Sequence, residues 1–175
     1  MDWMKTNSSP VVKWEDRNHP QYFSQTMTNG VSYEYIIQLC NLLDKDPWIC
    51  VPHKATDAFI TELATMFKND LAPDLNLYIE YSNEVWNGIF DQNTYSQHMG
   101  EQLGYSGEPW EQGWKYYVKR TFDIFNIFDS EFGDEQRLVK VLSGQSANSW
   151  LNNRLIEYAN DPAYNPELSN ADAFG

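Results

Sequence analysis

Basic residues are scarce in this sequence. Its 175 residues include 12 Lys and Arg against 25 Asp and Glu, which gives a formal net charge of -13. A surface this acidic repels polyanions, so nucleic acid and acidic membrane surfaces are excluded as expected partners. A neutral or cationic ligand suits the charge better.

Cysteine and histidine are also sparse, with 2 and 3 residues. Cys40 and Cys50 match no metal or redox spacing, so we expect two buried thiols, with a disulfide as the alternative. The histidines His19, His53 and His98 are scattered along the chain. Their spacing predicts no metal site, and no cofactor is expected.

Long apolar runs are absent. No segment approaches the ~18 consecutive apolar residues of a membrane span, so no membrane partner is expected. The first residues, Met1 to Met4, show neither the basic region nor the apolar stretch of a signal peptide. The cellular location therefore cannot be inferred from these features.

What the chain does contain is alternation of strand and helix signals within a length that suits one domain, residues 1–175. Strands are expected at residues 2–4, 48–51, 77–81 and 138–142. Helices are expected after Ser32, after Thr56, after Pro109 and around Trp150 to Tyr158. Four strands alternating with helices predict an α/β fold with parallel strands joined by right-handed crossovers.

Two connections that follow strand ends are long, residues 7–31 and 87–108. In α/β folds the carboxyl ends of the strands carry the ligand, so these loops indicate the functional end of the sheet. Aromatic residues make up 15% of the chain. They suit stacking against sugar rings, although a core rich in aromatics is the alternative.

The segment 76–87, NLYIEYSNEVWN, alternates as a strand and then ends in a polar and aromatic cluster. Asn83 and Glu84 would project at the mouth of the sheet, with Glu80, Trp86 and Asn87 crowded into the same small region. Burying such groups together is costly unless a ligand or partner satisfies them. The alternative interpretation is that Asn83 and Glu84 only cap the following helix.

This segment resembles the fourth-strand signature of retaining glycoside hydrolases of clan A, which are (β/α)8 barrels. The resemblance implies that Glu84 is the general acid/base and that Asn83 contacts the 2-hydroxyl of the sugar. It further implies a partial TIM barrel of about four βα units, spanning family strands two to five. The implied ligand is a β-linked oligo- or polysaccharide such as cellulose, and the implied location is extracellular.

Four further residues are candidate sugar contacts: Trp86, His53, Trp14 and Gln145. His53 follows a strand end, where members of the clan often place a polar residue, although a buried structural histidine is the alternative. Gln145 follows the last predicted strand in the segment SGQSAN, which could equally cap the next helix.

The nucleophile of the clan is a Glu at the end of strand seven, which the resemblance does not reach. A retaining glycosidase needs two carboxyls about 5 to 5.5 Å apart, and no second one is found. The alternatives are a fragment of a longer enzyme and a non-catalytic protein that binds carbohydrate or self-assembles. Half a barrel also leaves open sheet edges, which predict self-association or complementation by a missing half barrel.

Overall fold

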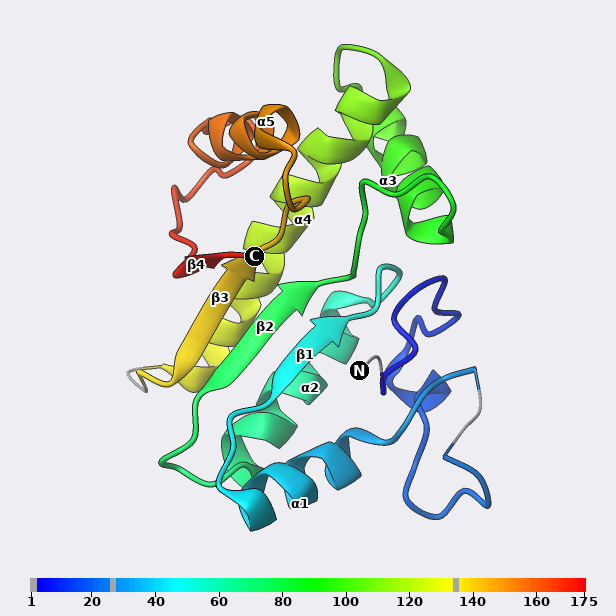
Figure 1. Cartoon of the computed structure of the whole chain (residues 1–175), viewed down its shortest axis with the longest axis vertical. Helices are drawn as coiled ribbons and strands as arrows, with labels where there is room; N and C mark the ends of the chain where they lie inside the picture. The colour runs from blue at the N-terminus through cyan, green and yellow to red at the C-terminus, as the bar shows by residue number, and fades with distance from the viewer. Residues whose placement is uncertain (1–2, 26–27, 134–135) are drawn as a thin grey trace.

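The computed structural model describes residues 3–25, 28–133 and 136–175 (Figure 1). In chain order its elements are η1 (Trp14–Asp16), α1 (Tyr33–Leu43), β1 (Trp48–Val51), α2 (Asp57–Asp70), β2 (Leu77–Tyr81), α3 (Asp91–Gln102), α4 (Pro109–Phe132), β3 (Leu138–Leu142), α5 (Ser149–Ala159) and β4 (Ala173–Phe174). The mixed α/β class is confirmed.

The four strands form one parallel sheet in the order β1-β2-β3-β4. Each strand therefore lies beside the one before it, with a helical crossover between them, as the alternation predicted. Within the described residues the sheet stays open between β1 and β4. Whether it is part of a (β/α)8 barrel remains a prediction.

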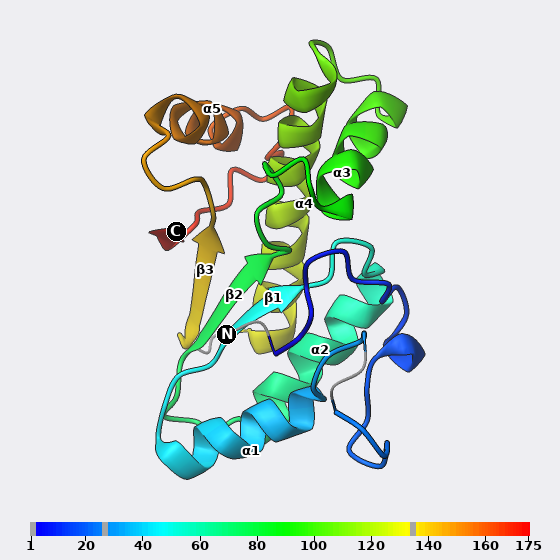
Figure 2. The same cartoon turned by 45° about the vertical axis from the view of Figure 1, so that its right-hand side comes forward.

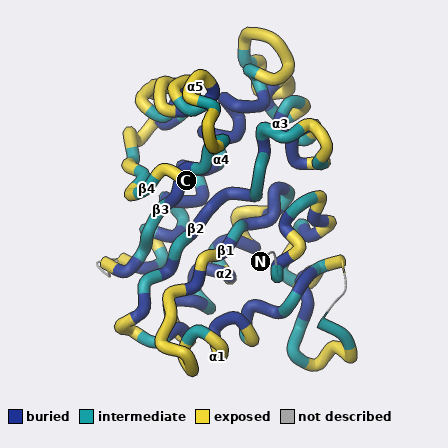
Figure 3. The backbone as a smooth tube through the Cα atoms, in the orientation of Figure 1, coloured by how far each residue is buried: buried dark blue, intermediate teal, exposed yellow. Residues whose placement is uncertain are grey.

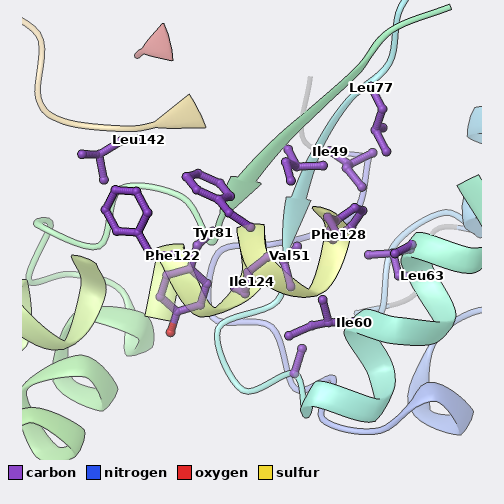
Figure 4. Close-up of a cluster of buried hydrophobic side chains, with 14 of the residues drawn as sticks. Ile49, Val51, Ile60, Leu63, Leu77, Tyr81, Phe122, Ile124, Phe128 and Leu142 are labelled. Atoms are coloured by element: carbon purple, nitrogen blue, oxygen red, sulfur yellow. The ribbon is translucent and has the colours of Figure 1, made fainter. Parts of the chain in front are cut away.

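Helices α2 and α4 cover one face of this sheet (Figure 2). Alternate strand residues point toward them, among them Ile49 and Val51 of β1 and Leu77 and Ile79 of β2, and all four are buried. Figure 4 shows these strands beside α2 and α4, and Figure 3 colours each residue by how far it is buried. On the other face Trp48 is about half exposed, at 48%.

The described part of the segment predicted as a strand, residues 2–4, is not a strand. Asp2 lies outside the described residues, and Trp3 and Met4 lie in a turn. Lys5 and Ser8 follow with left-handed φ angles of 52° and 53°, which break an extended path. The segment still lies beside β1, because the Met4 sulfur accepts a hydrogen bond from the Cys50 N–H over 3.4 Å.

The second long connection is not a loop, because residues 91–102 form α3. Its buried positions are mostly polar, Gln92, Asn93 and Ser96 together with Gly100. Without an apolar stripe there is no helical periodicity for sequence analysis to detect. The four helices that were predicted are confirmed, and Thr56 caps α2 by accepting from the Phe59 N–H over 3.2 Å.

Candidate functional site

The chain turns sharply where β2 ends. Ser82 and Glu84 both adopt left-handed backbone conformations, with φ angles of 59° and 45°. Such conformations cost energy in residues other than glycine, and they gather at functional sites. Helix α3 begins only at Asp91, with Phe90 as its N-cap residue. The interpretation of Asn83 and Glu84 as helix-capping residues is therefore wrong.

Beyond this turn lies a narrow cavity at the carboxyl ends of β2 and β3. Its walls include two carboxyls, Glu80 and Glu84, and two indoles, Trp86 and Trp114. The remaining wall residues are Tyr81, Val85, Tyr117, Ser143, Gly144, Leu151 and Leu155. The space holds about one water molecule, so a ligand larger than water would lie across its mouth and not inside it.

Glu84 is half-buried at this cavity. Its Oε2 accepts a hydrogen bond of 2.9 Å from the Asn87 side-chain amide, three residues along the chain. In the described part of the chain no side chain or backbone group binds its Oε1 by a hydrogen bond. One oxygen is thus oriented by the protein, while the other is free to contact a ligand.

Glu80 is the second carboxyl of the cavity; sequence analysis placed it in the same cluster but gave it no catalytic or binding role. It is buried, and its Oε2 accepts hydrogen bonds from Trp48 Nε1 over 2.9 Å and from Cys50 Sγ over 3.8 Å. Burial raises the pKa of Glu80, and hydrogen bonds from Ser143, Trp48 and Cys50 partly offset the rise. Glu80 is therefore harder to ionise than an exposed Glu.

Asn83 belongs to a network of side-chain amides behind the turn. Its Nδ2 donates to Asn7 Oδ1 over 3.1 Å. Gln92 Nε2 donates over 2.6 Å to the same oxygen and over 2.6 Å to the Asn83 carbonyl. The network ties the segment at Asn7 to β2 and α3, so the Asn83 side chain has a fixed orientation.

Trp86 and Gln145 come from neighbouring loops at the same end of the sheet. The Trp86 indole N–H donates to the Gly144 carbonyl over 3.1 Å, which ties the loop after β2 to the loop after β3. Gln145 Oε1 accepts from the Asn148 amide over 2.7 Å. Asn148 also caps α5 by accepting from the Leu151 N–H, so the capping interpretation of this segment is confirmed.

His53 and Trp14 do not line the cavity. The His53 ring is buried and packs against the Tyr95 ring in a T-shaped arrangement, with 5.3 Å between the ring centroids and 71° between the planes. Burial and, to a smaller extent, the charge of Lys54 lower the pKa of His53 to about 4. Trp14 packs against Phe59, and its ring lies under the Arg17 guanidinium at 4.0 Å.

Cys40 and Cys50 are both half-buried, and no disulfide joins them. No group of three metal-ligating side chains gathers within residues 3–25, 28–133 and 136–175. Over the same ranges, no helix combines the length and the apolar character needed to cross a membrane.

Fold and site together define an α/β protein with a parallel sheet and a carboxyl-containing cavity at the carboxyl ends of its strands. Comparison with protein-family models, with curated proteins and with solved structures finds no match to this chain. Function must therefore be argued from the site itself.

Proposed function

We propose that this chain binds a β-linked oligo- or polysaccharide, such as cellulose, across the cavity mouth, with Glu84 as the general acid/base of a glycoside hydrolase. One observation carries the proposal. Glu84 and Trp86 meet in one cavity at the carboxyl ends of adjacent parallel strands, where α/β proteins place their ligands.

The local chemistry supports this role. An indole provides a flat apolar surface for the carbon face of a sugar ring, and an accessible carboxyl can protonate the oxygen that leaves. The backbone turn at Ser82 and Glu84 and the Asn87 hydrogen bond hold that carboxyl in place. The resemblance of segment 76–87 to the clan A signature adds Asn83 as the contact to the 2-hydroxyl.

The second carboxyl of a retaining mechanism has weaker support. Glu80 shares the cavity with Glu84, but it is buried and its Oε2 already accepts hydrogen bonds from Trp48 Nε1 and Cys50 Sγ, whereas a nucleophile must reach the sugar. This observation favours a second candidate function, in which the chain binds the sugar and does not hydrolyse it. In that case Glu84 serves as a hydrogen-bond acceptor for sugar hydroxyls.

Hydrolysis of an aryl β-cellobioside separates the two candidates. If the chain is an enzyme, Glu84→Gln should lower kcat by at least about 100-fold, because general acid catalysis typically contributes ~10²–10⁴. Glu101→Gln, an exposed position on α3, is the matched control and should keep the wild-type rate.

A wild-type rate in Glu84→Gln would remove the acid/base role. If the wild-type chain hydrolyses nothing but binds cello-oligosaccharides in calorimetry, the binding function replaces the enzymatic one. Absence of both hydrolysis and binding would reject the proposed function.

A further inference from the structure

Three tryptophans meet where α4 and α5 begin: Trp110, Trp114 and Trp150, here called the tryptophan platform. Ring centroids are 4.7 Å apart for Trp110 and Trp114, 5.4 Å for Trp110 and Trp150, and 5.5 Å for Trp114 and Trp150. Trp114 is buried, while Trp110 is 36% and Trp150 54% exposed. The platform thus has a buried base and an open side.

Packing between the two helices does not require the exposed indoles. Leu151, Leu155 and Tyr158 of α5 are already buried. Trp110 and Trp150 add apolar surface that remains in contact with water, which is unfavourable unless a ligand or partner covers it. Figure 1 shows α5 beside the first half of α4, at the end of the molecule to which β2 and β3 point.

The platform is continuous with the candidate site. Trp114 lines the same cavity as Glu84 and Trp86, so aromatic surface extends from the acid/base candidate to Trp110 and Trp150. A ligand that lies across the cavity mouth therefore has a second place to stack.

Polar groups beside the platform suit a neutral sugar. The loop that leads to Trp150 carries Gln145 and Asn148, whose side-chain amides are hydrogen-bonded to each other and half-buried. Amides can donate to and accept from hydroxyls, and indole faces cover the carbon–hydrogen face of a pyranose ring. The net charge of -13 disfavours an acidic glycan.

We propose that Trp110 and Trp150 form a second sugar-binding subsite, which stacks one pyranose unit of a neutral β-linked glycan whose other units lie over the mouth of the Glu84 cavity. This inference rests on the proposed function, because it places the rest of the chain at that cavity. It assigns the platform to binding longer oligosaccharides and not to the chemical step.

Calorimetric titration with cellobiose and with cellohexaose tests the subsite. Wild-type protein should bind cellohexaose more tightly than cellobiose. Trp150→Ala and Trp110→Ala should each bind cellohexaose roughly tenfold more weakly, because each removes one stacked ring. Their affinity for cellobiose should stay unchanged. Phe23→Ala, another exposed aromatic, is the control and should change neither affinity.

Trp150→Phe keeps an aromatic face and should restore most of the cellohexaose affinity, which guards against a loss caused by misfolding. Wild-type affinity for cellohexaose in both alanine variants would overturn the subsite and leave the proposed function standing. If the alanine variants instead show a lower molar mass than the wild type in ultracentrifugation, with unchanged sugar affinity, the platform is a contact between protein chains. That result would also overturn the subsite. No binding of either sugar by the wild-type chain would overturn the subsite, and together with absence of hydrolysis it would reject the proposed function.

Discussion

His53 is a buried imidazole whose two ring nitrogens form no hydrogen bond within the described residues. Burial lowers its pKa from 6.5 to about 4. Between those pH values the unfolded chain binds a proton that the folded chain does not. As far as His53 is concerned, the free energy of unfolding therefore has its full value above pH 6.5. It falls by up to about 3 kcal/mol as the pH drops toward 4.

The variant His53→Phe should lack this pH-dependent loss of stability, since a phenyl ring keeps the contact with Tyr95 but cannot be protonated. Urea unfolding at pH 7, 5.5 and 4 measures the effect: the stability of wild type relative to the variant should fall by about 3 kcal/mol across that range. His98→Gln, on an exposed position of α3, should follow the wild-type curve. Parallel curves for wild type and His53→Phe would contradict the assignment.

For single residues, the sequence predicted where the site residues lie along the strands better than it predicted which groups surround them. Asn83, Glu84, Trp86 and Gln145 do lie at strand ends, because strand alternation and the change in composition after Tyr81 are local signals. The burial of Glu80 and the amide network around Gln92 depend on residues from other elements. No local pattern carries that information.

Two glycines allow α3 and α4 to pack closely. A Cβ on Gly100 would lie 2.2 Å from the Gln112 carbonyl oxygen of α4, and one on Gly113 would lie 3.0 Å from Gln97 Cγ of α3. Backbone cannot move away as easily as the end of a side chain. The Gly100 position therefore limits how near the two helices can lie, and a Cβ on Gly113 would also meet the Gln97 backbone N, at 3.1 Å.

Gly100→Ala should destabilise the fold by about 2 kcal/mol, since the overpacking cost exceeds the gain in helix propensity. Chemical denaturation at neutral pH measures it. Gly88→Ala is the control, because a Cβ there meets only Asn93 Oδ1 at 3.9 Å, and it should change stability by less than about 0.5 kcal/mol. An unchanged midpoint for Gly100→Ala would show that the helices can separate at little cost.

Element prediction succeeded where periodicity and burial coincide. Apolar residues at helical spacing located α2, α4 and α5, and alternation located β1, β2 and β3. It failed for α3, whose buried face is polar, and for residues 2–4, where the apolar signal was short. The apolar stripe of α1 was found, yet its Leu39 and Leu43 are exposed.

For the whole molecule, exposed apolar side chains gather on α1 and at the start of β1. Leu42 is 80%, Leu43 54% and Trp48 48% exposed. On its outer side β1 pairs with no other strand of the described chain, so its backbone groups there remain available. An open strand edge beside apolar surface favours pairing with another chain. We expect this region to mediate self-association.

Sedimentation velocity over a range of protein concentrations tests the expectation. Wild-type protein should show a molar mass that rises with concentration, because association removes apolar surface from water. The double variant Leu42→Arg/Leu43→Arg should remain monomeric, since association would bury two charges without partners. Leu168→Arg, at a position that is 55% exposed and lies outside α1 and β1, should associate as the wild type does. A wild-type chain that stays monomeric at every concentration would contradict self-association. If Leu168→Arg loses self-association as fully as the double variant does, the contact lies outside α1 and β1.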